Sequence, residues 1–130
     1  MNINPETVLH FGYIKPAKNT LTQQVGIDVT TKNDLCIPPH KFAQVESAEE
    51  FNMRGVFAIP VARSTYNRRG ILMPGCVIDP GYKGTIWMSI YNFTDEPFSI
   101  YAGTRVMQVV FFRADAAKMY DGQYQNGKTR

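Results

Sequence analysis

Turn residues divide the chain into many short apolar segments, and this division constrains its fold more than any other feature. Five segments are rich in Val, Ile, Phe and Tyr, the residues that favour β-strands. Turn signals such as Pro74-Gly75, Pro80-Gly81 and Ala102-Gly103 separate them. The pattern predicts strands over 41–46, 56–61, 85–93, 98–101 and 105–112. Many short strands with little helix are typical of an all-β sandwich or barrel of jelly-roll type.

Two segments carry helix signals. Asn4-Pro5-Glu6 has an N-cap residue, a first-turn proline and a first-turn acid, which predicts a short helix ending near His10. Ser47 to Glu50 has capping-box spacing and predicts a single helical turn. The polar stretch 114–130 predicts a flexible C-terminal arm. A chain of 130 residues suits one compact domain, so we expect 1–130 to form a single unit.

Composition excludes several classes of protein. The net charge of +3 is too small to predict a nucleic-acid polymer as partner, although it suits a polyanionic small ligand. No apolar run approaches the roughly 20 residues of a membrane span, and Met1 to Lys15 lack the layout of a signal peptide. Two cysteines and two histidines make a His/Cys metal site improbable. We therefore expect a cytoplasmic protein with no membrane partner.

The segment Arg63 to Gly70 departs from the strand pattern. It holds three arginines together with the hydroxyls of Ser64 and Thr65, directly after an apolar strand. Such groups form charge-assisted hydrogen bonds to phosphate oxygens. The alternative interpretation is a solvated basic loop without a ligand.

Asp79 and Gln108 are two further polar residues inside apolar surroundings. A carboxylate at Asp79, between apolar strands and glycine turns, can serve as a general base for a water molecule. The alternative is an Asp-Pro-Gly turn whose side chain bonds local backbone amides. An amide at Gln108 is costly to bury without hydrogen bonds, so it either satisfies a core partner or lines a site.

Taken together and in order, these segments resemble the dUTPase/dCTP deaminase family. Gly26-Ile27-Asp28, Arg63-Ser64, Ile78-Asp79 with Tyr82-Lys83-Gly84, and Gly103 to Gln108 resemble its successive motifs, and Tyr120 to Gln125 is similar to the arm of dCTP deaminases. The resemblance spans 25–130. It implies the distorted jelly-roll of trimeric dUTPases, a homotrimer, and sites that draw residues from neighbouring subunits.

The resemblance also implies roles for single residues. Asp79 would hold the attacking water, and Tyr82 would pack on the deoxyribose and exclude a 2′-hydroxyl. Phosphate oxygens and the base would be bound by Arg63, Ser64, Thr65, Arg68, Gln108 and, from the arm, Tyr124. Mg²⁺ would bridge the triphosphate. Asp28 would contact that ion through a water molecule or orient Arg63.

Ser89 separates the two branches of this family. Its deaminases carry a glutamate five residues after the motif glycine, where it shuttles protons, and here that position after Gly84 is Ser89. A serine hydroxyl cannot replace a carboxylate in this role near neutral pH. We therefore expect Mg²⁺-dependent hydrolysis of dUTP to the monophosphate and pyrophosphate. Deamination of dCTP and nucleotide binding without catalysis are the alternatives, and Pro74 in the shortened base-reading hairpin leaves the base open.

Overall fold

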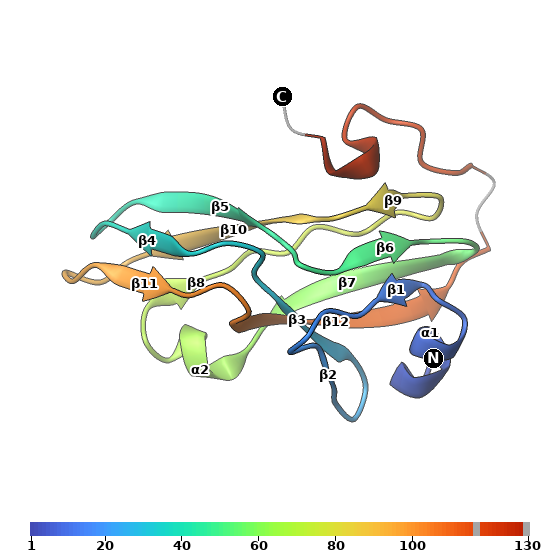
Figure 1. Ribbon diagram of the computed structural model, residues 1–130, viewed down its shortest axis with the longest axis horizontal. Helices are drawn as coiled ribbons and strands as arrows, with labels where there is room; N and C mark the ends of the chain where they lie inside the picture. Colours follow the sequence, from blue (N-terminus) through green and yellow to red (C-terminus); the bar gives the residue numbers. More distant parts are fainter. Residues whose placement is uncertain (116–117, 129–130) are drawn as a thin grey trace.

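The computed structural model describes residues 1–115 and 118–128, and most of its regular secondary structure consists of short antiparallel strands (Figure 1). The strands form four small sheets in the orders β1-β6-β9, β5-β10-β8, β11-β4 and β2-β3-β12-β7. Their bounds are β1 Ile14–Lys15, β2 Leu21–Thr22, β3 Ile27–Thr30, β4 Leu35–Ile37, β5 Phe42–Glu46, β6 Glu50–Asn52, β7 Val56–Ala62, β8 Ile71–Leu72, β9 Lys83–Gly84, β10 Trp87–Asn92, β11 Phe98–Ile100 and β12 Arg105–Arg113. The sheets pack as a sandwich, which confirms the predicted fold class.

All five predicted strands are present, as β5, β7, β10, β11 and β12. The additional strands have only two to four residues each. Such short segments carry no readable alternation of apolar and polar side chains, so the sequence pattern did not reveal them.

The predicted N-terminal helix is confirmed as α1 (Pro5–His10), which Asn4 caps by accepting from the Glu6 N–H at 2.8 Å. The helical turn predicted at Ser47 to Glu50 is wrong. The Glu49 carboxylate is buried and accepts from the Thr30 N–H at 2.9 Å and the Thr30 hydroxyl at 2.8 Å. This side chain is therefore committed to a neighbouring strand, and the chain continues as β6.

The core is centred on β12, which lies between β3 and β7. Ile27, Val29, Val109 and Phe111 are at most 1% exposed, and the Phe111 ring stacks on Phe51 with centroids 6.2 Å apart. Each large apolar side chain buried in this way stabilises the fold by about 1.5–3 kcal/mol. The central sheet is thus a rigid support for side chains on its outer face.

Two further features concern the residues that the structure describes. None of their helices is long and apolar enough to cross a membrane. Cys36 and Cys76 are free and exposed.

Candidate functional site

A buried aspartate orients an arginine where β3, β7 and β12 meet. Arg63 follows the end of β7, and its Nη1 donates to the Arg105 carbonyl oxygen at 3.1 Å. Its Nε lies 3.6 Å from Oδ2 of Asp28, whose side chain is 1% exposed. Gln23 Nε2 donates to the same Asp28 oxygen at 2.8 Å. Because a buried carboxylate needs partners of this kind, Asp28 and Arg63 hold each other in place.

Gln108 joins this group through strand register. It pairs with Asp28 on β3 and with Val61 on β7. Residues directly opposite one another in antiparallel strands share a face, and Arg63 lies two residues beyond Val61 on that face. Gly26 permits the close approach, because a Cβ there would lie 2.8 Å from Gln108 Cγ. We call Gln23, Asp28, Arg63 and Gln108 the arginine cluster.

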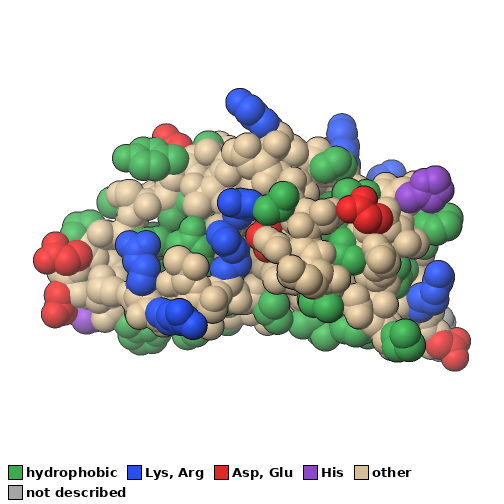
Figure 2. Space-filling view, turned by 90° about the horizontal axis from the view of Figure 1, so that it is seen from below, with side chains coloured by type: hydrophobic (Ala, Val, Ile, Leu, Met, Phe, Trp, Pro, Cys, Tyr) green, Lys and Arg blue, Asp and Glu red, His purple; other side chains and the backbone are tan. Residues whose placement is uncertain are grey.

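The other predicted phosphate ligands follow Arg63 along the chain, and none of them forms a side-chain hydrogen bond to the arginine cluster in the described structure. Ser64 and Thr65 open the short helix α2 (Ser64–Asn67), Arg68 follows it, and all three are exposed. Tyr66 anchors the helix, since its hydroxyl donates to the Arg105 carbonyl oxygen at 3.2 Å. Figure 2 shows several Lys and Arg side chains spread over the face seen from below, with hydrophobic and acidic side chains between them. This face therefore presents cationic and hydroxyl donors suited to phosphate oxygens.

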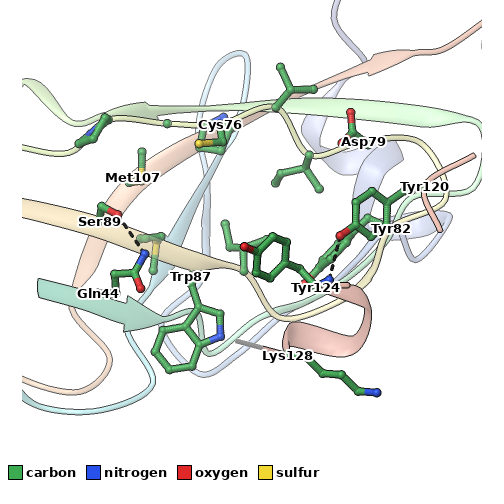
Figure 3. A pocket seen from close by; sticks show the side chains of 17 residues that line it. Gln44, Cys76, Asp79, Tyr82, Trp87, Ser89, Met107, Tyr120, Tyr124 and Lys128 are labelled. Carbon is green, nitrogen blue, oxygen red and sulfur yellow. Dashed lines mark hydrogen bonds between the residues drawn. The ribbon is translucent and has the colours of Figure 1, made fainter. Parts of the chain in front are cut away.

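Asp79 lies at a cavity of about 510 Å³ beside β10 (Figure 3). Ile78 exchanges two backbone hydrogen bonds with Ala58, at 2.8 and 3.0 Å, which fixes the chain just before it. The Asp79 carbonyl accepts from the Tyr82 N–H at 3.1 Å, as expected of a turn. Its carboxylate, however, bonds no residue that the structure describes. The alternative interpretation, in which the Asp79 side chain bonds local backbone amides, is therefore not supported by the structure. We call the cavity at this residue the Asp79 cavity.

Tyr82 lines the Asp79 cavity but is 8% exposed. Its hydroxyl donates to the Thr85 carbonyl oxygen and accepts from the Gly127 N–H at 3.1 Å. Burial raises the pKa of Tyr82 above its ordinary 10.0, so the hydroxyl stays protonated near neutral pH and keeps its donor role. The ring is consequently held rigidly against the cavity.

The described part of the C-terminal arm, residues 118–128, lies against the turn that carries these residues (Figure 1). The Tyr120 ring packs edge-on against Tyr82, with centroids 5.4 Å apart. Gln125 accepts from the Lys83 N–H at 2.6 Å and donates to the Gly81 carbonyl oxygen at 3.2 Å. The sequence predicts an arm that reaches the site of another subunit, whereas here it packs beside the Asp79 cavity of its own chain.

Three arm side chains, Tyr120, Tyr124 and Lys128, line the Asp79 cavity. Tyr124 is 44% exposed, so its ring retains surface on which a flat ligand could stack. Trp87 belongs to the same wall, and its Nε1–H donates to the Gly127 carbonyl oxygen at 2.9 Å.

Deleting residues 120–130 is expected to expose this wall without unfolding the sandwich, because every buried residue of the core cluster precedes the arm and only the partly buried Tyr120 of the deleted segment packs against it. Trp87, the only tryptophan, loses its bond to Gly127 and gains contact with water. Its fluorescence emission should therefore shift to longer wavelength while far-UV circular dichroism is nearly unchanged. An unshifted emission spectrum would contradict the docked position of the arm.

The arginine cluster and the Asp79 cavity lie on opposite faces of the β2-β3-β12-β7 sheet. Pro60 and Met107 line the cavity. Gln108 follows Met107 and points the opposite way, because side chains alternate along a strand, and Arg63 lies on the same face as Gln108. A single chain therefore does not bring Arg63 next to Asp79.

The chain offers few ligands for a metal ion. Within residues 1–115 and 118–128 there is no group of three or more His, Cys, Asp or Glu side chains that could hold one. Oδ1 of Asp28 is buried without a hydrogen-bond partner in that part of the chain. This leaves one oxygen that could accept from a water molecule on an ion. The donor set therefore fits Mg²⁺ carried by a triphosphate, which needs only one or two protein carboxylates.

Several residues that line the Asp79 cavity were not singled out from the sequence. Gln44 on β5, Cys76 in the 73–78 segment and Trp87 on β10 reach it only through the fold. Gln44 lies opposite Ser89 in the β5–β10 register. These two residues are 45 positions apart in the chain, so the strand register that pairs them has no local signal in the sequence.

Comparison of the sequence with known proteins identifies the family. The family model described as dCTP deaminase-like matches residues 10–114. A dCTP deaminase of Campylobacter concisus is 40% identical over 102 residues, which cover 77% of this chain and 55% of that protein. A dCTP deaminase of Nautilia profundicola is 43% identical over 88 residues, covering 67% and 47%. The chain spans about half the length of the curated relatives it matches.

Solved structures share the fold at low sequence identity. The dUTPase of Staphylococcus bacteriophage 80alpha, solved with dUPNHPP, superposes with a TM-score of 0.69 at 16% identity, covering 85% of this chain and 86% of that one. The 2′-deoxycytidine 5′-triphosphate deaminase of Agrobacterium tumefaciens gives a TM-score of 0.73 at 13% identity, covering 84% and 46%. Both branches therefore adopt the architecture seen here, and with the family model matching most of its length, this chain belongs to the dUTPase/dCTP deaminase family.

Proposed function

We propose that this chain hydrolyses dUTP to dUMP and pyrophosphate. One observation carries the proposal: Asp79 is the only carboxylate among the described residues that line the cavity. Ser89 lines the same cavity at the position where the family resemblance expects the proton-shuttling glutamate of a deaminase. The described lining of the cavity thus holds a base for water but no second acid for ring deamination.

The proposed reaction is an in-line displacement at the α-phosphorus. The Asp79 carboxylate accepts a proton from a water molecule while the oxygen of that water bonds to the α-phosphorus. The bond from the α-phosphorus to the oxygen that bridges the α- and β-phosphates breaks. Pyrophosphate leaves with the electron pair of that bond. Arg63 and Gln108 would bind phosphate oxygens, helped by Ser64, and the ring of Tyr82 would pack on the deoxyribose. Such a site accelerates the reaction by positioning and charge neutralisation.

Mg²⁺ carried by the triphosphate would neutralise charge on its oxygens. Asp28 would meet that ion through a water molecule at Oδ1, while Oδ2 keeps Arg63 oriented. The Asp28 carboxylate would thus serve both roles that the resemblance implies, contact with the metal ion through water and orientation of Arg63.

We further propose that the working unit is a homotrimer in which a neighbouring chain supplies the arginine cluster to each Asp79 cavity. The opposite placement of the two groups on one sheet supports this arrangement. Exposed aromatic rings also support association: Phe42 and Phe93 are 62% and 55% exposed, and both stack on Tyr91. Closed cyclic symmetry is the usual way to bury a surface that every copy carries.

Deamination of dCTP is the second candidate, favoured by the dCTP deaminases among the sequence relatives. A single experiment separates the candidates. The protein is incubated with Mg²⁺ and each deoxynucleoside triphosphate in turn, and pyrophosphate and ammonia are assayed separately.

We expect pyrophosphate from dUTP and no ammonia from dCTP. Ammonia from dCTP at a rate comparable with hydrolysis would instead identify a deaminase with a different proton relay. Tight nucleotide binding with neither product would identify a binding protein on the same fold.

A further inference from the structure

Gln44 and Ser89 form an uncharged hydrogen-bonded pair in the wall of the Asp79 cavity. The two residues lie directly opposite each other in the β5–β10 ladder, and Gln44 Nε2 donates to Ser89 Oγ at 3.3 Å. Their strand neighbours Met88 and Val45 are buried in the core, so the pair points away from it. Both residues line the cavity.

This pair stands at one end of the cavity, and Asp79 stands at the other (Figure 3). Tyr82 and Tyr120 lie at the Asp79 end, whereas Met107 is near Ser89. Asp79 and Lys128 are the only charged residues among the described lining residues. The end of the cavity at Gln44 and Ser89 is therefore uncharged, and a ligand there is recognised by hydrogen bonds and by its shape.

We propose that Gln44 and Ser89 select the 4-keto edge of a uracil-type base, an inference that rests on the proposed placement of the sugar at Asp79 and Tyr82. With the sugar at that end, the far edge of the ring points towards the pair. In the observed bond Ser89 Oγ accepts, so its own proton is free to be donated, and Gln44 Oε1 is free to accept. Uracil presents the complement, an acceptor at O4 and a donor at N3.

Cytosine presents the opposite polarity, with a donor at N4 and an acceptor at N3. To bind it, the Gln44 amide would have to turn over and its bond to Ser89 would have to reverse, with the Ser89 hydroxyl donating to Gln44 Oε1 while Ser89 Oγ accepts from N4. The observed direction of the Gln44–Ser89 bond thus complements uracil, whereas cytosine requires both groups to reorient. The pair therefore favours the keto base.

Binding of dUMP and dCMP tests this, because neither nucleotide has a pyrophosphate to lose. Trp87 is the only tryptophan and lines the cavity, so its fluorescence reports occupancy. The wild type should bind dUMP about tenfold more tightly than dCMP, and Gln44→Leu and Ser89→Ala should each remove most of that preference. Gln24→Leu and Ser99→Ala, exposed positions outside the cavity lining, should retain it.

An unchanged dUMP preference in both cavity variants would overturn the inference, as would the absence of any Trp87 response to either nucleotide. Pyrophosphate release from dUTP is measured in parallel. If pyrophosphate is released while the variants keep the wild-type preference for dUMP, Gln44 and Ser89 do not select the base, although the proposed reaction stands. If the preference depends on the pair but no pyrophosphate forms, the reaction fails and the base assignment holds.

Discussion

Asp79→Asn is expected to lower kcat for pyrophosphate release from dUTP by about 10³-fold, the range for loss of a general base. The amide keeps the size and shape of the side chain but is a far poorer proton acceptor. Since the carboxylate bonds no described residue, its replacement removes no observed contact of the fold. KM and the unfolding temperature should therefore stay close to those of the wild type.

Asp115→Asn provides the matched control, because it makes the same chemical change at an exposed position outside the cavity lining. It should retain full activity. A near-normal kcat in Asp79→Asn would reduce Asp79 to a turn residue and remove the basis of the proposed reaction. A large rise in KM with unchanged kcat would instead make it a binding residue.

The longer strands could be predicted because each contains at least three residues that favour strands and is bounded by turn residues. The region after Ser47 shows the limit of local signals. Its capping-box spacing is real, but burial of Glu49 against Thr30 on another strand decides the outcome. Tertiary hydrogen bonds of this kind depend on which strands become neighbours, and no sequence window contains that information.

In the candidate site, too, some residues could be predicted from local sequence motifs and others could be found only from the fold. The motif residues Asp28, Arg63 and Gln108 do meet, because strand register brings them together. Gln44 could not be found, since an amide on an exposed strand face looks like ordinary surface until its partner strand is known. The family resemblance implied only that each site draws residues from neighbouring subunits, and the placement of the arginine cluster and Asp79 on opposite faces of one sheet is a finding of the structure.

That separation leads to a complementation test with a large expected effect. Arg63→Ala and Asp79→Asn should each be nearly inactive when prepared alone. If every site combines Arg63 of one chain with Asp79 of its neighbour, some mixed trimers contain sites in which both residues are intact. In an equal, random mixture about a quarter of the sites meet this condition. Activity should therefore return to about a quarter of the wild-type value after the two variants are unfolded and refolded together.

Two controls make the result decisive. A mixture of Asp79→Asn with Asp79→Ala contains no intact Asp79 and should stay inactive at every ratio. Light scattering should report three times the 14.7 kDa chain mass for each variant and for the mixture, which shows that assembly itself is unimpaired. If mixed trimers form and activity does not return, both residues must act from the same chain. The arrangement on opposite faces of the sheet would then have to change on nucleotide binding, and the shared site would be wrong.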